Sequence, residues 1–138
     1  MIRVLAVLLA LLPALAAAQD DLIDPDVFGA EAIGKTYWFS EQGNHYGAEQ
    51  YFPDQTTIWQ GRNGECKKGR WWSEGDAMCF AYEDDPTPDC WVMWEGDGGR
   101  IMIESLRPLE GPEDSALVLE LIRRTPLPIS CTGPLLGV

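Results

Sequence analysis

Much of the chain alternates apolar and polar residues with a period of two, in short runs that are typical of β-strands. Clusters of Gly, Asn, Asp and Pro separate the runs and indicate tight turns, as at residues 61–64 and 96–99. The pattern predicts eight strands, over residues 36–40, 46–52, 56–60, 70–73, 77–82, 90–95, 101–106 and 116–122.

One short helix is predicted before the first strand. Asp24 offers a side-chain oxygen as an N-cap, Pro25 suits the first helical position, and Gly34 provides a stop. Eight strands with no helical pattern between them favour an all-β fold, a small antiparallel meander closed or nearly closed into a barrel. Closure is favoured because it removes the exposed strand edges.

The first 18 residues have the features of a signal peptide. Arg3 precedes an apolar run over residues 4–16, and three alanines ending at Ala18 suit signal peptidase. The run is short for a hydrocarbon core of about 30 Å, so we expect no membrane span after cleavage. The mature protein would then be periplasmic or secreted, with an N-terminal segment (19–35), a barrel (36–124) and a Pro-rich tail (125–138).

Four cysteines in an exported chain of this size predict two disulfides. Three pairings are possible for Cys66, Cys79, Cys90 and Cys131. The most local choice joins Cys79 to Cys90 across one hairpin, which requires an asymmetric or bulged turn, and leaves Cys66 to tie down the tail at Cys131. The cysteine spacings do not resemble those of zinc sites, and His45, the one histidine of the sequence, lies elsewhere.

The charge of the chain narrows the classes of partner. With 22 acidic and 10 basic residues the formal net charge is −12, which excludes a typical nucleic-acid binder and disfavours anionic membrane surfaces. A hydrophobic content of 46% is enough for a packed core. We expect a monomer whose partner is a protein or a small-molecule ligand.

Aromatic residues are the candidates for a binding surface. The chain has 14 of them, and in several predicted strands large rings occupy both faces, although a single-layer barrel buries only one. Some of these rings should therefore lie outside, as a partner surface or ligand platform, or beneath the helix and the tail. The candidates are Trp38, Trp71, Trp72, Trp91 and Trp94.

The sequence contains no convincing catalytic, metal or cofactor motif. His45 lies on a hairpin connector without a nucleophile motif nearby, and neither Cys-x-x-Cys nor a Gly-rich phosphate loop occurs. Prolines interrupt the acidic stretch over residues 83–89, which favours a solvated loop over a calcium site. We therefore expect a non-enzymatic binding module without cofactors, and a small carboxylate-dependent hydrolase is a less favoured alternative.

Three resemblances add to this interpretation. One resemblance is to small exported alphaproteobacterial proteins of unknown function, carried by Gly47-Ala48-Glu49-Gln50-Tyr51, Trp59, Cys66 and residues 69–71, 79–82 and 90–91. Residues 34–38 resemble the Gly-x-Trp opening of lipocalin-like barrels, with two extra residues before Trp38, and imply an eight-stranded barrel of that type. Size, charge and compartment resemble those of periplasmic lysozyme inhibitors, which implies an acidic inhibitor of a basic enzyme as the alternative function.

The export signal and the even cysteine count give a first testable prediction. Mass spectrometry of the protein from its native compartment should show a chain that begins at Gln19 and contains no alkylatable thiol. An intact Met1 or a reactive cysteine would contradict the predicted compartment.

Overall fold

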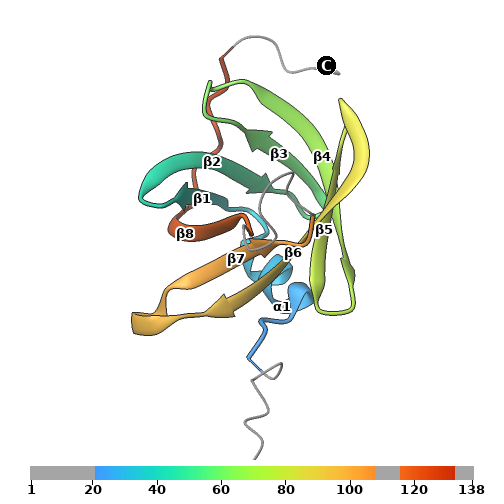
Figure 1. The fold of residues 1–138 in the computed structure, drawn as a ribbon. Coiled ribbons are helices and arrows are strands. Elements are labelled where there is room, and N and C mark those ends of the chain that lie inside the picture. Colours follow the sequence, from blue (N-terminus) through green and yellow to red (C-terminus); the bar gives the residue numbers. More distant parts are fainter. Residues whose placement is uncertain (1–20, 108–115, 133–138) are drawn as a thin grey trace, which may run out of the picture.

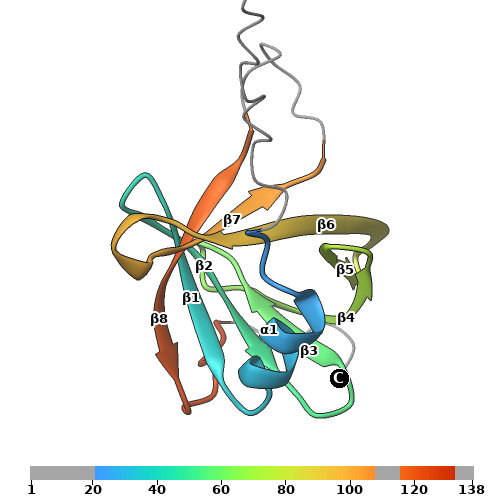
Figure 2. The ribbon, with the colours of Figure 1, turned by 90° about the horizontal axis from the view of Figure 1, so that it is seen from below.

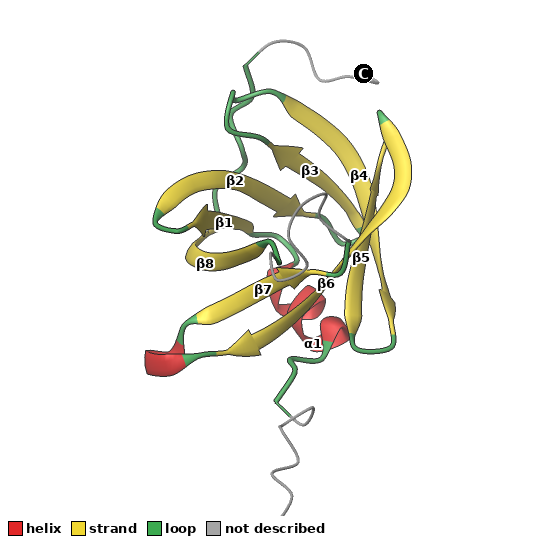
Figure 3. Ribbon diagram, viewed as in Figure 1, coloured by secondary structure: helices red, strands yellow, loops and turns green. Residues whose placement is uncertain are grey.

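The computed structural model describes residues 21–107 and 116–132, and it confirms an all-β barrel with one short helix. Eight antiparallel strands follow one another in sequence order around the barrel, and the last strand pairs with the first (Figure 1). Figure 3 shows that strands make up most of this part of the chain. They are β1 (Thr36–Glu41), β2 (Asn44–Tyr51), β3 (Thr56–Gln60), β4 (Cys66–Glu74), β5 (Ala77–Tyr82), β6 (Asp85–Glu95), β7 (Ile101–Ser105) and β8 (Val118–Thr125).

The predicted strands all occur, but β2 begins two residues earlier than expected and β4 and β6 begin earlier by four and five residues. Strand β4 already begins at Cys66, because its first residues pair with the end of β3. Strand β6 begins at Asp85, within the stretch that we expected to be a solvated loop. Its two prolines, Pro86 and Pro88, lie where the pairing with β5 is irregular, and such positions do not need every backbone N–H in the ladder.

The irregular pairing of β5 with β6 sets the position of one disulfide. Tyr82 pairs with Asp85 and Phe80 pairs with Asp89, so three residues of β6 lie opposite one residue of β5. This bulge places Cys79 directly opposite Cys90, and the two are joined. The expected hairpin disulfide and the expected asymmetry of its turn are both present.

Helix α1 (Pro25–Ala32) covers one end of the barrel, as Figure 2 shows from below. Its N-cap is Asp24, whose Oδ1 accepts a hydrogen bond of 2.8 Å from the backbone N–H of Asp26. Phe28 points into the barrel, with its ring centroid 5.4 Å from that of Tyr37. A Cβ atom at Gly29 would lie 2.3 Å from the Trp71 indole, so this position must lack a side chain for the helix to pack so closely.

Side chains on the inner faces of the strands form a single core with the helix. Alternate residues along each strand point inward, as the period of two requires. The buried members are Phe28, Ala32, Tyr37, Phe39, Tyr51, Trp71, Met78, Phe80, Met93, Ile103, Leu119 and Leu121.

The C-terminal tail crosses the outside of the barrel as a strap, defined here as residues 126–132. It is fastened to β4 by the disulfide between Cys66 and Cys131. The hydrogen bonds of the strap go to β1, β2, β3 and the β3–β4 turn. They join Thr36 Oγ1 to the Leu127 carbonyl (2.7 Å), the Ile129 N–H to Gln50 Oε1 (3.0 Å), Gln60 Nε2 to the Ser130 carbonyl (2.7 Å) and the Thr132 N–H to the Gly64 carbonyl (2.9 Å).

The two disulfides should differ in their contribution to stability. The Cys66–Cys131 bond closes a loop with a sequence separation of 65 residues, whereas the separation for Cys79–Cys90 is 11. Chain entropy then gives about 4 kcal/mol for the long loop and about 3 kcal/mol for the short one. Urea unfolding of the two double Cys→Ser variants should show the larger loss for the strap disulfide. An equal or reversed order would mean that the strap does not constrain the unfolded chain in this way.

Candidate ligand-binding cavity

The inside of the barrel contains a cavity of about 180 Å³ between the helix and the opposite end. Its floor consists of fully buried residues, among them Phe28 of the helix and Met93 of β6. Half-buried residues form the mouth, at the end where the β1–β2, β3–β4 and β5–β6 turns lie. The mouth residues are Tyr46, Trp59, Lys67, Tyr82, Asp89 and Trp91.

Aromatic rings make up most of the cavity wall. Eight of its fifteen lining residues are aromatic. The rings of Phe80 and Tyr82 are parallel with their centroids 6.3 Å apart, and the rings of Tyr46 and Trp59 lie 5.9 Å apart near the mouth. Tyr46 reaches the mouth because the β1–β2 pairing has a bulge there. The wall therefore presents several ring faces and edges to the enclosed space.

One carboxyl group, that of Glu49, lies in this aromatic interior. Its side chain is 2% exposed and lines the cavity, on the same face of β2 as Tyr51. The Tyr82 hydroxyl donates a hydrogen bond of 2.9 Å to Glu49 Oε2. The hydroxyl of the neighbouring Thr57 is buried without a hydrogen-bond partner, and the other oxygen of Glu49, Oε1, also has none among the described residues. A buried polar atom without a partner is costly, and here it belongs to a group that lines an enclosed space.

Burial raises the pKa of Glu49 to about 8. The low-dielectric surroundings disfavour the carboxylate, and the neighbouring Thr57 and Tyr82 side chains and the Lys67 charge offset this only in part. At neutral pH the group is therefore mainly a neutral acid. Burial also raises the pKa values of Tyr51 and Tyr82 well above their usual range, so both phenols stay neutral.

The Tyr82 ring can lie over the inner face of the sheet because Gly69 is opposite it in β4. A Cβ atom at Gly69 would come within 2.5 Å of this ring. The glycine thus allows the phenol to lie flat on the strand and to direct its hydroxyl toward Glu49.

Ion pairs surround the mouth of the cavity. Lys67 lies 3.5 Å from Asp84, and Arg107 lies 2.7 Å from Asp89. The Lys67 ammonium also lies 4.7 Å from the centroid of the Tyr82 ring, and the Arg62 guanidinium lies 5.2 Å from that of Tyr46. Two aromatic rings at the mouth therefore already have a side-chain cation against them.

A second hollow lies on the outer face of β3, β4 and β5. It is larger, about 860 Å³, but it opens widely to solvent. Its lining includes exposed residues such as Asp54, Arg70 and Glu83, which are common on any protein surface. The inner cavity is the better candidate site, because it is the more enclosed of the two and contains a buried group with an unpaired atom.

The five candidate tryptophans do not share one surface. Trp71 is buried against helix α1, and Trp91 lines the mouth of the cavity. The other three, Trp38, Trp72 and Trp94, are half-buried and alternate with inward residues of their strands, so they lie on the outer face. Arg123 packs on the Trp38 ring at 4.2 Å, and Arg70 packs on that of Trp72 at 4.8 Å.

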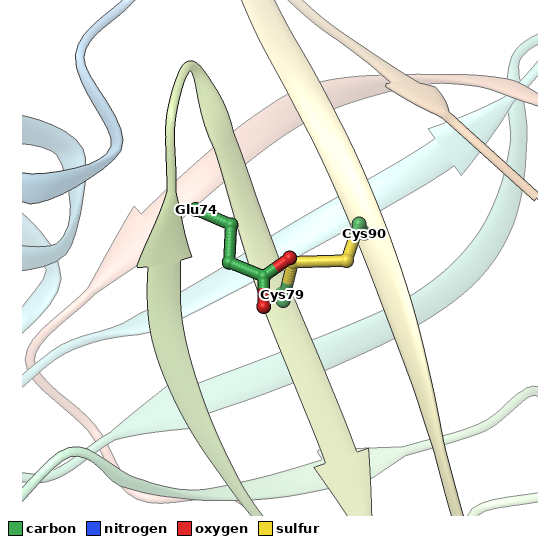
Figure 4. Close-up of side chains that lie close together, drawn as sticks. All are labelled: Glu74, Cys79 and Cys90. Carbon is green, nitrogen blue, oxygen red and sulfur yellow. A yellow bond between two sulfur atoms is a disulfide. The ribbon is translucent and has the colours of Figure 1, made fainter.

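Figure 4 shows the one cluster in the described residues whose atoms could in principle hold a metal ion: Glu74, Cys79 and Cys90. The Glu74 carboxylate lies 3.9 Å from the Cys79 sulfur. Because this sulfur is bonded to that of Cys90, the pair offers a disulfide instead of the thiolates that metals require. The cluster is therefore a disulfide with a nearby carboxylate.

His45 and the acidic stretch over 83–89 do not form a catalytic or metal-binding cluster in the described structure. His45 is exposed, whereas Ser40, its cross-strand neighbour, is buried, and no hydrogen bond joins them in the described structure. In the acidic stretch over 83–89, Asp84 pairs with Lys67, Asp89 pairs with Arg107, and Asp85 accepts a hydrogen bond from the Thr87 N–H. These carboxylates therefore have separate partners.

Sequence reasoning did not identify Glu49, Lys67 or Asp89 as site residues. A signal was available for Glu49, since it shares the inward parity of Tyr51 in a strand whose other inward position is Gly47. The predicted signal peptide lies outside the described residues.

No family model, curated protein or solved structure matches the chain. In the described part of the chain, no helix combines the length and apolar character needed to cross a membrane.

The buried carboxyl predicts a pH dependence of stability. Its folded pKa of about 8 exceeds the ordinary value of 4.5, so between these values the unfolded chain loses a proton that the folded protein keeps. The contribution of Glu49 to the free energy of unfolding is therefore fully present below pH 4.5 and is lost as pH rises toward 8. The loss is on the order of 3 kcal/mol between pH 5 and pH 8.

The Glu49→Gln variant has no proton to lose at this position. Its free energy of unfolding should therefore rise relative to that of the unmodified protein as pH increases from 5 to 8. Glu120→Gln is the matched control, because Arg100 lowers the pKa of Glu120 and the group titrates below the range. Its difference from the unmodified protein should stay constant. A constant difference for Glu49→Gln as well would contradict the raised pKa.

Proposed function

We propose that this protein is an exported, non-enzymatic binding module that holds a small ligand inside its barrel. The observation that carries the proposal is Glu49 Oε1, a buried polar atom that lines an aromatic cavity without a partner. A ligand with a polar group would supply the missing contact, while the rings would cover its apolar part.

The volume of the cavity limits the size of the ligand. An apolar protein cavity of roughly 150 Å³ accommodates benzene. The 180 Å³ inside this barrel therefore suit a molecule with one ring, or a chain of similar bulk, with a polar group attached. Drug-sized ligands occupy roughly 300–1,000 Å³ and would have to protrude through the mouth. An eight-stranded barrel that encloses one small ligand also agrees with the lipocalin-like resemblance.

Export and the absence of catalysis belong to the same proposal. Two disulfides are typical of periplasmic and secreted proteins, and they agree with the signal peptide expected from the sequence. A hydrolase would need a second free carboxylate beside Glu49, whereas Asp89, also in the cavity wall, is paired with Arg107.

A second candidate function is inhibition of a basic enzyme. It is favoured by the net charge of −12 and by the exposed acidic turn at Glu83, Asp84 and Asp85 between β5 and β6. Such a charge would speed the encounter with a cationic partner and make it sensitive to salt. In that case substitutions in the turn would weaken binding, whereas substitutions in the cavity would not.

Ligand binding can be tested by filling the cavity. Calorimetric titration of the mature protein with a panel of one-ring compounds should reveal saturable binding. The Leu119→Phe variant places an extra ring in the cavity space and should abolish that binding. Val118→Phe, on the outer face of the same strand, should leave it unchanged. Absence of binding throughout the panel, or equal binding by both variants, would refute the proposed site.

A further inference from the structure

The composition of the cavity wall indicates more than the size of the ligand. The wall combines Glu49, a buried group that can become an anion, with eight aromatic residues. Aromatic faces carry negative electrostatic potential and attract cations, most strongly where water is excluded. A buried carboxyl and several rings in one enclosed space form a typical environment for a positively charged nitrogen.

We propose that the cavity binds a small organic cation, an amine with about one ring, whose ammonium group lies against Glu49. This inference rests on the proposed ligand-binding function and adds the chemical class of the ligand. On binding, Glu49 releases its proton to solvent and the ammonium keeps its own, so a buried ion pair replaces a buried neutral acid. The ammonium supplies the donor that Glu49 Oε1 lacks.

The overall charge of the molecule favours the approach of such a ligand, although two rings of the mouth, those of Tyr46 and Tyr82, are already occupied by the cations of Arg62 and Lys67. The net charge of −12 concentrates cations around the molecule. A negatively charged ligand would meet the opposite field and would have to lie beside Glu49.

The charged groups that face Glu49 allow this exchange. Lys67 of β4 would repel an ammonium, but its charge is held at the mouth by Asp84, 3.5 Å away. Asp89 of β6 is paired with Arg107. Tyr51 of β2 and Tyr82 of β5 are neutral because burial raises their pKa values well above 10. Glu49 is therefore the acidic group that is free to pair with the ligand inside the cavity.

A neutral ligand that accepts a hydrogen bond from protonated Glu49 is the competing interpretation. The two interpretations predict opposite dependences on pH. Glu49 must ionise to pair with an amine, and with a pKa of about 8 this ionisation lowers the affinity about tenfold at pH 7. Binding of an amine should therefore strengthen as pH rises toward 8, whereas binding of a neutral acceptor should weaken above pH 8.

The test compares benzylamine with benzyl alcohol, which has the same ring and nearly the same size but no charge. Calorimetric titrations of the mature protein at pH 6, 7 and 8 would use two buffers that differ in ionisation enthalpy. We expect benzylamine to bind at least about tenfold more tightly than benzyl alcohol at pH 8, with its affinity increasing about tenfold from pH 6 to pH 7 and about fivefold from pH 7 to pH 8. About one proton should be released per bound amine at pH 6 and pH 7.

The Glu49→Gln variant supplies the matched control. It should lose the preference for benzylamine, the proton release and the increase with pH, while its affinity for benzyl alcohol should stay within about threefold. The pH series on the unmodified protein tests the same point without any substitution, so the inference does not depend on the folding of the variant.

Two other results of these titrations would overturn the inference. If benzyl alcohol binds as tightly as benzylamine, and no proton is released, the cationic ligand is refuted while the ligand-binding function stands. The function stands in that case only if Leu119→Phe removes the binding. If neither compound nor any other member of the one-ring panel binds at the cavity, the ligand-binding function and this inference both fail.

Discussion

The pairing of β1 with β8 is the constraint on which the rest of the structure depends. It joins the two ends of the meander and removes the edges that an open sheet would expose. A closed barrel of eight strands has an interior just wide enough for side chains or for one small ligand. Closure therefore fixes both the enclosed space and its size, and each inward residue becomes part of either the core or the cavity wall.

The two ends of the barrel differ because one of them is covered. Helix α1 occupies one end, and its Phe28 and Gly29 pack against Tyr37 and Trp71. The other end carries the β1–β2, β3–β4 and β5–β6 turns and, in the described part of the chain, two ion pairs and half-buried side chains around the opening. Hydrophobic burial at one end and solvated charges at the other give the cavity a closed floor and an open mouth.

Local signals were sufficient to predict most of the fold. The Asp24-Pro25 start of the helix, the alternation along the strands and the hairpin spacing of Cys79 and Cys90 depend on residues close in sequence, and each is present in the structure. The cavity could not be predicted in this way, because the environment of Glu49 exists only after β2 faces β5 across the closed barrel. The faces of the five tryptophans could not be assigned for the same reason, since parity does not say which face closure will bury.

The buried carboxyl group of Glu49 has a cost in stability, which the rest of the fold must offset. An apolar residue at this position would fill space and leave no polar atom without a partner, so the carboxyl makes the empty barrel less stable by roughly 1–3 kcal/mol. The strap disulfide contributes a stabilisation of similar order from the outside of the barrel, far from the cavity. Stability supplied by the strap thus offsets the cost of a buried polar group, which in the proposed function is the group that contacts the ligand.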